Sequence, residues 1–208
     1  MSYTVFGDHG SGAFSAEAAL AEAGAPYEFK LISLEKSEQR APEFLAINPS
    51  GKMPALRLPE GVIVTESSAI LLTIADHFPQ ARLLPPQASP ARGQAYRWIS
   101  FLASEVYPMI EVVDYPDRFV PKGETADTLR IAARDRVRER MQLVQRSIAG
   151  EWMLPTGFSI VDIYAAMFSR WILKAYREEH LRDLTALAER VGARPAIAPI
   201  WKRHFTKN

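Results

Sequence analysis

The residues best suited to bind a small molecule lie between Asn48 and Ile70, in the run NPSGKMPALRLPEGVIVTESSAI. Met53 and Pro54 come directly before a predicted strand, where a proline is tolerated although it lacks the N–H group that interior strand residues donate. If the bond between them is cis, the backbone N–H and C=O of Met53 turn outward and can pair with the peptide groups of a ligand. This pattern indicates a site for an extended molecule.

Glu66, Ser67 and Ser68 form the second chemical feature of this run, because they open a helix with apolar periodicity. The first turn of a helix presents unpaired N–H groups and a partial positive charge, which bind carboxylates readily. Taken alone, the three residues are at least as typical of a helix cap as of a binding site. Their spacing from Met53-Pro54 brings a strand entrance and a helix start to the same sheet edge, which favours a carboxylate-binding site.

Residues 7–12, GDHGSG, join the first predicted strand to the first predicted helix. Such a glycine-rich junction lets a ligand approach the backbone and the start of the helix. It is not a Walker loop, because no Gly-Lys-Ser/Thr follows, and its glycine spacing does not match the dinucleotide fingerprint. Taken alone, Ser11 is more typical of a helix cap than of a catalytic residue, and His9 is typical of a solvent-facing loop.

The composition excludes several classes of function. The net charge of +1 gives no attraction to nucleic acid or to an anionic membrane. The absence of cysteine excludes disulfides, thiolate metal sites and a cysteine nucleophile, and the four histidines are scattered, so we expect no metal site. Neither a signal peptide nor a transmembrane run is recognisable, which predicts a cytoplasmic protein.

The first half of the chain alternates strands and helices, and we predict the order β-α-β-α-β-β-α. A strand-helix-strand unit requires a parallel pair, and a hairpin adds an antiparallel edge, so we expect a mixed sheet covered by helices. The predicted elements span residues 3–6, 13–23, 27–34, 37–47, 55–59, 62–65 and 66–77. A proline-rich stretch follows and is typical of a linker.

After this linker the sequence has helical periodicity throughout, which predicts an all-α domain of about five helices. The predicted helices span residues 91–113, 126–148, 160–176, 181–191 and 196–204. Ser159 and Asp162 fit a capping box at the start of the third of these helices, which we interpret as structural. The charged run at residues 134–140 is typical of a solvated helix face.

Taken together, these motifs resemble the cytosolic glutathione transferase superfamily, and the resemblance covers nearly the whole chain. The motifs that carry it occur in the family's order and spacing: Asn48-Pro49-x-Gly51-x-x-Pro54-x-Leu56, Glu66-Ser67, the proline-rich linker and Ser159-x-x-Asp162. The resemblance implies an α/β plus all-α fold. Residues 1–78 would form a thioredoxin-like glutathione-binding domain, residues 79–90 a linker and residues 91–208 the all-helical domain.

The resemblance also implies a set of contacts to glutathione as co-substrate. Met53, before the cis-proline Pro54, would pair with the cysteinyl backbone of the tripeptide. Glu66 and Ser67 would hold its γ-glutamyl end. Lys52 lies beside this turn and could reach the glycyl carboxylate.

Residues 104–108, SEVYP, resemble the pattern of the bacterial beta class. In that class an acid at the position of Glu105 reaches the glutathione of the partner subunit, which implies a homodimer. The class usually has histidine where this chain has Tyr107. Tyr107 and Tyr115 each precede a proline that bends or breaks the helix, and we expect both to line an electrophile pocket facing the first domain.

The thiol-activating residue of the family lies at the end of the first strand or the start of the first helix. Beta-like enzymes have a cysteine at the position of Gly12, so this chain departs from them, whereas serine-type classes have their serine near Gly10 or Ser11. Ser11 is therefore the first catalytic candidate, with His9 and Tyr3 behind it. Its hydroxyl would donate a hydrogen bond to the glutathione sulfur and lower the thiol pKa.

Three functional hypotheses follow from this resemblance. The first is a homodimeric glutathione transferase that conjugates the thiolate to a small hydrophobic electrophile, with no metal, nucleic acid or membrane partner. The second is a glutathione-dependent disulfide reductase of the same fold. The third is a non-catalytic, transferase-like binding or regulatory protein, which the missing catalytic cysteine keeps open.

Overall fold

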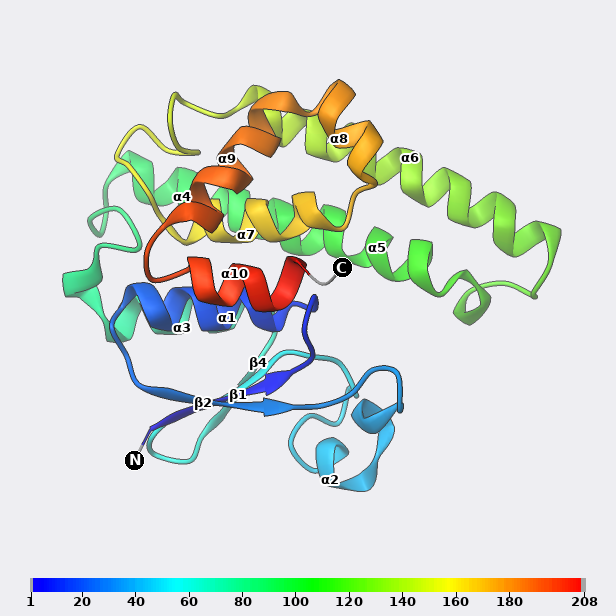
Figure 1. The fold of residues 1–208 in the computed structure, drawn as a ribbon, viewed down its shortest axis with the longest axis horizontal. Coiled ribbons are helices and arrows are strands. Elements are labelled where there is room, and N and C mark those ends of the chain that lie inside the picture. Colours follow the sequence, from blue (N-terminus) through cyan, green and yellow to red (C-terminus); the bar gives the residue numbers. More distant parts are fainter. Residues whose placement is uncertain (1, 207–208) are drawn as a thin grey trace.

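The computed structural model describes residues 2–206, and its chain folds into a small sheet domain and a larger helical domain (Figure 1). The sheet has the strand order β2-β1-β3-β4. β1 pairs with β2 in parallel and with β3 antiparallel, and β4 extends the sheet antiparallel to β3. The strands are β1 (Tyr3–Gly7), β2 (Tyr27–Leu31), β3 (Ala55–Arg57) and β4 (Ile63–Thr65).

Three helices complete the sheet domain, so the predicted β-α-β-α-β-β-α order is confirmed. They are α1 (Ala13–Glu22), α2 (Pro42–Leu45) and α3 (Ser67–His77). α1 and α3 lie between the sheet and the helical domain in Figure 1, whereas α2 lies on the other side of the sheet. The prediction for residues 37–47 was too long: a 3-10 turn at Glu38–Arg40 precedes α2, since Pro42 lacks an N–H group and can stand only in the first turn of a helix.

The helical domain contains seven α-helices within residues 2–206, rather than the predicted five. They are α4 (Pro90–Phe101), α5 (Tyr107–Asp114), α6 (Glu124–Arg146), α7 (Ile160–Arg170), α8 (Lys174–His180), α9 (Arg182–Ala193) and α10 (Ala198–Phe205). The helix predicted over residues 91–113 is divided by a π-helical turn at Leu102–Val106, directly before Tyr107 and Pro108. The helix predicted over residues 160–176 is divided into α7 and α8. None of the helices within the described range is both long and apolar enough to cross a membrane.

One hydrophobic core runs through both domains, because α1 and α3 pack against α7. Every residue of α7 except the last is buried, and the predicted capping box at its start is confirmed. Asp162 Oδ1 accepts the N–H of Met153 at 2.7 Å, and Oδ2 accepts the N–H and the hydroxyl of Ser159 at 2.8 and 3.0 Å. The box therefore ties the start of α7 to the loop that precedes it.

The C-terminal helix α10 returns to the sheet domain and packs on α1, as Figure 1 shows. The ring of Phe14 on α1 meets those of Trp201 and Phe205 on α10, with centroids 5.4 and 4.9 Å apart. Arg194 reinforces this contact, since its guanidinium binds both carboxylate oxygens of Glu22 at 2.8 Å. Residues more than 170 positions apart in sequence are thus held side by side.

The packing of α9 on α10 leads to a first prediction, for Gly192→Ala. A Cβ atom added to Gly192 would lie 2.6 Å from the Trp201 ring, so the ring must move and the free energy of unfolding should fall by about 1–3 kcal/mol. Gly93 on α4 is the matched control, since a Cβ atom there meets nothing within 4 Å. Gly93→Ala should be neutral or stabilise by up to about 1 kcal/mol. Urea unfolding measures both, and equal stabilities would contradict the clash.

Candidate functional site

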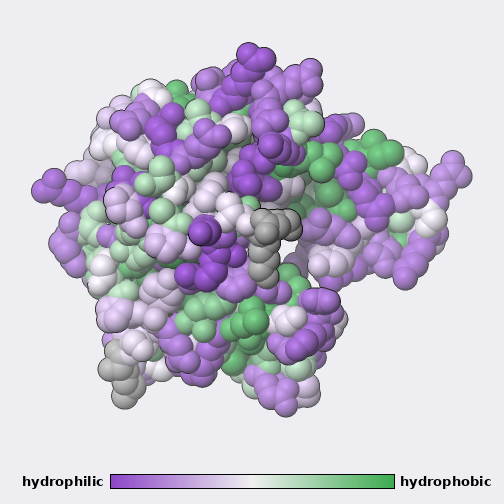
Figure 2. Space-filling model, viewed as in Figure 1, coloured by the Kyte–Doolittle hydropathy of each residue, from purple (hydrophilic) through white to green (hydrophobic). Residues whose placement is uncertain are grey.

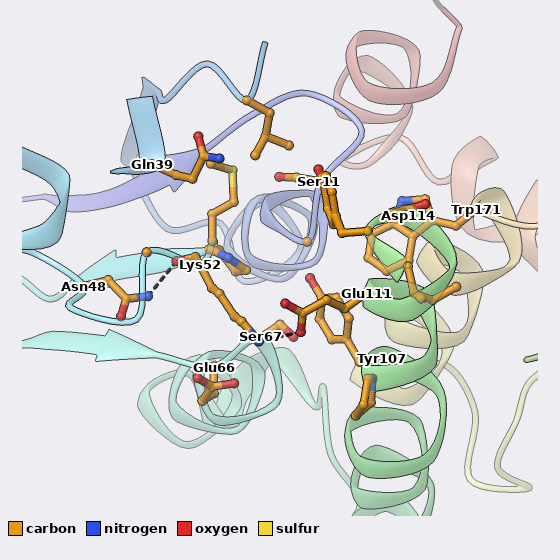
Figure 3. Close-up of a pocket in the computed structure, with 18 of the residues that line it drawn as sticks. Ser11, Gln39, Asn48, Lys52, Glu66, Ser67, Tyr107, Glu111, Asp114 and Trp171 are labelled. Atoms are coloured by element: carbon orange, nitrogen blue, oxygen red, sulfur yellow. Dashed lines mark hydrogen bonds and ion pairs between the residues drawn. The ribbon is translucent and has the colours of Figure 1, made fainter. Parts of the chain in front are cut away.

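A cleft of about 460 Å³ lies between the two domains. One wall comes from the sheet domain: the loop at residues 10–12, the segment that ends at Pro54, and the start of α3. The opposite wall comes from α5 and from Trp171, as the close-up in Figure 3 shows. In the space-filling view of Figure 2 the molecular outline is notched where the sheet domain meets the projecting ends of α5 and α6. The cleft is large enough for a small peptide-sized ligand.

Met53, Pro54, Glu66 and Ser67 all line this cleft, so two separate motifs of the sequence meet at one place. The Met53-Pro54 peptide bond is cis, and Pro54 stands directly before β3. Glu66 has φ +64° and ψ +115°, a backbone conformation that is costly for a residue with a side chain and is characteristic of ligand sites. α3 begins at the next residue, Ser67, so the first turn of this helix faces the cleft.

The turn before Met53 is held by Asn48. The Asn48 side chain donates to the carbonyl oxygen of Lys52 at 2.6 Å and accepts the N–H of Ser50 at 3.1 Å. Gly51 has φ +60°, which glycine adopts without steric cost. The Asn-Pro-Ser-Gly sequence therefore sets the direction in which the chain enters β3.

Ser67 is buried and its hydroxyl forms a 2.8 Å hydrogen bond with that of Tyr164 on α7. Burial raises the pKa of Tyr164, although the hydrogen bond to Ser67 opposes this effect. Tyr164 is therefore a neutral phenol that can donate to Ser67, which leaves the Ser67 proton for an anionic ligand. No local pattern in the sequence distinguishes Tyr164, because a tyrosine in an apolar helix is typical of a core residue.

Lys52 lies at the mouth of the cleft and is already paired. Its ammonium group is 2.7 Å from the carboxylate of Glu111 on α5, and Arg118 binds the same carboxylate at 3.1 Å. Burial alone would raise the pKa of Glu111, but Lys52 and Arg118 hold it below its usual value. Lys52 can reach a ligand carboxylate only by exchanging this partner, a pairing that no local pattern in the sequence indicates.

Ser11 lines the cleft, but its hydroxyl proton is committed to the loop. The hydroxyl donates to the carbonyl oxygen of Asp8 at 2.6 Å and accepts the N–H groups of Asp8 and Ala13 at 3.3 and 3.2 Å. A hydroxyl has a single O–H to donate. The expectation that Ser11 offers this proton to a ligand is therefore at odds with its hydrogen bonds, which give it a role in shaping the start of α1.

The other two catalytic candidates lie away from the cleft lining. His9 is not the solvent-facing loop residue we expected, since its ring stacks on Phe29 with centroids 5.3 Å apart and meets the edge of His204. Tyr3, at the other end of β1, shares a 2.9 Å hydrogen bond with His77. Neither residue is among those that line the cleft.

The glycine loop at the cleft is held by the helical domain. The N–H of Gly10 donates to Nδ1 of His204 at 3.0 Å, and the indole N–H of Trp171 donates to the carbonyl oxygen of Gly10 at 2.7 Å. Both contacts join residues more than 160 positions apart. The glycine loop is therefore positioned from outside the sheet domain.

Glu17 lies behind this loop and is fully buried within α1. Its carboxylate accepts from Tyr27 at 2.9 Å, from Arg203 at 2.6 Å and from Nε2 of His204 at 2.7 Å. Because Nδ1 of His204 accepts the backbone N–H of Gly10, its Nε2 carries the proton donated to Glu17. Burial alone would raise the pKa of Glu17, but the hydrogen bonds from His204 and Tyr27 and the charge of Arg203 hold it below its usual value.

Tyr107 and Tyr115 both line the cleft, where we expected an electrophile pocket. The Tyr107 ring packs against those of Phe168 and Trp171, with centroids 5.2 and 5.3 Å apart. Tyr115 is 39% exposed and lies under the guanidinium of Arg118, 3.8 Å from its ring centroid. The helical domain thus contributes an aromatic wall.

Glu105 is not among the residues that line the cleft of the single chain. Its carboxylate binds Arg140 at 3.0 Å and Arg136 at 3.6 Å on α6. Its expected contact with the glutathione of a partner subunit stays a prediction. Within residues 2–206, no group of three or more His, Cys, Asp or Glu side chains is arranged to hold a metal ion.

Comparison with known proteins agrees with this architecture. Residues 1–76 match the family model of the glutathione S-transferase N-terminal domain. A bacterial beta-class glutathione S-transferase from Sphingomonas chungbukensis has the same fold, with a TM-score of 0.80 and 28% identity, over 96% of this chain and 97% of that one. Residues 1–76 thus match the glutathione S-transferase family, and the comparisons as a whole support the cytosolic glutathione transferase superfamily.

Two further proteins are similar to this chain. Glutathione S-transferase GstA of Escherichia coli O157:H7 is 27% identical over 175 residues, which cover 82% of this chain and 84% of GstA. A glutathione transferase homologue from Sulfitobacter, solved with bound glutathione, superposes with a TM-score of 0.89 over 98% of this chain and 99% of that one. At 24% identity, this second likeness concerns the fold alone.

Proposed function

We propose that this protein binds glutathione in the cleft between its domains and transfers the thiolate to a small hydrophobic electrophile. The observation that carries the proposal is the meeting of Met53-Pro54 and Glu66-Ser67 on one wall of the cleft. The Sulfitobacter homologue, which shares the fold, was solved with glutathione bound. An aromatic wall of Tyr107 and Tyr115 faces these residues across the cleft and suits an apolar second substrate.

Each part of the tripeptide has a partner in this arrangement. The backbone of Met53 pairs with the cysteinyl residue, as an added strand does at a sheet edge. The γ-glutamyl carboxylate binds at the start of α3, where Ser67 and the helix N-terminus both favour an anion. The carboxylate of Glu66 faces the γ-glutamyl ammonium group, and Lys52 takes the glycyl carboxylate in place of Glu111.

The chemistry requires a thiolate held against an electrophile. The thiol proton passes to solvent, the sulfur forms a bond to carbon, and the leaving group departs with its electron pair. With its middle residue beside Met53, glutathione has its sulfur near Gly12 at the start of α1. The partial positive charge of that helix start favours the thiolate over the thiol.

Binding and turnover test this function separately. Glutathione binding is measured by calorimetry, conjugation with chlorodinitrobenzene, and disulfide reduction with hydroxyethyl disulfide. We expect binding and conjugation. Binding with disulfide reduction alone would instead support the reductase hypothesis, binding without either reaction would support a non-catalytic module, and no binding would contradict the proposal.

Ser67→Ala gives a prediction specific to the glutamyl end. Loss of a hydrogen bond to a charged group costs about 1.5–3 kcal/mol, so the Kd for glutathione should rise about 10- to 100-fold. Ser68→Ala is the matched control, because Ser68 is the next residue of α3 and is not among those that line the cleft. Its Kd should stay within about twofold of the wild-type value. Equal affinities for the two variants would exclude Ser67 from the site.

We further propose a homodimer in which Glu105 contributes to the site of the partner subunit. The proposal rests on the resemblance of residues 104–108 to the beta-class pattern. Glu105 is about half-exposed and lies with two arginines on α6, so it can exchange one partner for another. Sedimentation measures the oligomeric state. A monomer at the protein concentrations used for activity measurements would contradict both the homodimer and the contribution of Glu105 to the site of the partner subunit.

A further inference from the structure

Gly12 and Tyr107 approach each other so closely that only glycine fits at position 12. A Cβ atom added to Gly12 would lie 2.5 Å from the Tyr107 hydroxyl oxygen and 2.9 Å from Cδ of Pro54. The carbonyl oxygen of Met53 lies 3.6 Å from the same point. The phenol hydroxyl of α5 therefore occupies the space in which the side chain of residue 12 would begin.

The backbone before Tyr107 is shaped to bring this residue into the cleft. The π-helical turn at Leu102–Val106 ends directly before it, and Pro108 directly after it has no N–H to continue the α-helical pattern. π-helical turns are rare and occur frequently at functional sites. Phe168 and Trp171 then hold the ring by edge and tilted contacts, so that its hydroxyl points into the middle of the cleft in Figure 3.

The Tyr107 hydroxyl is available to a ligand. It lines the cleft, and among the described residues no side chain or backbone group is hydrogen-bonded to it. This contrasts with Ser11, whose proton goes to the carbonyl oxygen of Asp8 at 2.6 Å. Of the Ser11 and Tyr107 hydroxyl groups, only that of Tyr107 has no acceptor for its proton among the described residues.

We propose that Tyr107 is a catalytic residue, whose phenol O–H donates a hydrogen bond to the glutathione sulfur and stabilises it as the thiolate. The inference rests on the proposed function, because it requires the cysteinyl residue to pair with Met53. An extended ligand paired there has its middle side chain beside Pro54 and Gly12, where the hydroxyl lies. The helical domain thus supplies the hydrogen-bond donor to the sulfur that Gly12, which has no side chain, cannot supply.

Tyr107 acts in this step as a donor and not as a base. Burial, followed by the negative charges around it, raises the pKa of Tyr107, so the phenol keeps its proton throughout. The thiol proton goes to solvent, the sulfur forms the new bond to carbon, and the leaving group departs with the bonding electrons. The hydrogen bond from Tyr107 favours the thiolate over the thiol and thereby lowers the pH at which the bound thiol ionises.

The Tyr107→Phe variant tests the proposal, because it removes one oxygen atom and keeps the ring packed against Phe168 and Trp171. Loss of a single preorganised donor should lower kcat for chlorodinitrobenzene conjugation by about 10- to 1,000-fold, with the Kd for glutathione within about threefold of wild type. The pH profile of kcat should shift upward, toward the pKa of about 8.5 of a free thiol. Tyr96→Phe removes a phenol hydroxyl from a residue that does not line the cleft and should change neither quantity.

Gly12→Ala provides a second, independent variant. Its Cβ atom must displace the Tyr107 hydroxyl, so kcat should fall in the wild-type background and fall little further in the Tyr107→Phe background. Unchanged kcat and pH profile in Tyr107→Phe would overturn the inference, as would a loss of glutathione affinity equal to the loss of kcat. If the wild-type protein fails to bind glutathione, the proposed function itself is wrong. This result is distinct from the two outcomes for Tyr107→Phe, which concern the role of Tyr107 alone.

Discussion

We expect a Glu17→Ala variant to unfold at a much lower urea concentration than the wild-type chain, with its free energy of unfolding reduced by about 3–5 kcal/mol. Glu17 is fully buried in α1, and its carboxylate is the common acceptor for His204, Tyr27 and Arg203. Removing it leaves buried donors without an acceptor, which costs their full desolvation energy. Glu28→Ala, at an exposed acid on β2, is the matched control and should change stability by less than about 0.5 kcal/mol.

The same carboxylate should make stability depend on pH in a defined direction. Because the pKa of Glu17 in the folded chain is held below its usual value, its contribution is fully present above the unfolded value of about 4.3 and is lost as pH falls through the folded one. The difference in unfolding free energy between wild type and Glu17→Gln should therefore be constant from about pH 7 to 5 and become smaller below that range. A difference that grows as pH falls would contradict the assignment.

Glu17 also connects stability to the site. Its partner His204 accepts the N–H of Gly10, so the cluster holds the loop at which α1 begins. A weakened cluster should loosen this loop, and the Kd for glutathione should rise in Glu17→Gln even where the chain remains folded. The loss of affinity would then come from positioning, since Glu17 itself does not line the cleft.

An Asp162→Ala variant should lose about 2–4 kcal/mol of unfolding free energy. Its two carboxylate oxygens accept two buried backbone N–H groups, those of Met153 and Ser159, together with the Ser159 hydroxyl. Alanine leaves these groups unpaired at the start of α7, the most deeply buried helix of the molecule. Burial raises the pKa of Asp162 to about 6, although these hydrogen bonds oppose the effect.

Asp183→Ala is the control for this second prediction, because Asp183 also stands in the first turn of a helix but is exposed. Its loss should be about 0.3–1 kcal/mol, the usual effect of an acid near a helix N-terminus. Equal losses of unfolding free energy in Asp162→Ala and Asp183→Ala would show that the capping box contributes little.

The free energy of unfolding should also depend on pH. Since the folded pKa of Asp162 is raised, ionisation of Asp162 reduces stability as pH rises through about 6.

The sequence predicted which residues meet in the cleft better than it predicted the hydrogen bonds of their side chains. Met53-Pro54 and Glu66-Ser67 are local patterns, in which a proline at a strand entrance and a hydroxyl at a helix start have meaning from their neighbours alone. The structure has these four residues together on one wall. Element boundaries were less accurate, since Pro42 and Pro108 alter helical periodicity over several residues.

The partners of Ser11 and Ser67 show why side-chain roles were harder to predict. The position of Ser11 suits a catalytic role, but its hydroxyl proton goes to the carbonyl oxygen of Asp8. Sequence spacing does not determine whether a serine hydroxyl donates to its own turn or to a ligand. Ser67 depends on Tyr164, which lies 97 positions away. A burial pattern cannot distinguish a tyrosine that supports a ligand site from one that only fills the core.

The sequence by itself determined the fold class and which residues form the sheet-domain wall of the cleft, because these depend on hydrophobic periodicity, proline chemistry and helix starts. Only the tertiary structure decided which hydroxyl proton is available in the cleft. It also decided that the buried Glu17 holds the glycine loop in place through His204. The reason is physical: a hydroxyl has one proton and a carboxylate has few lone pairs. Their use is therefore settled by whichever distant groups the packing of the helices brings within hydrogen-bond distance.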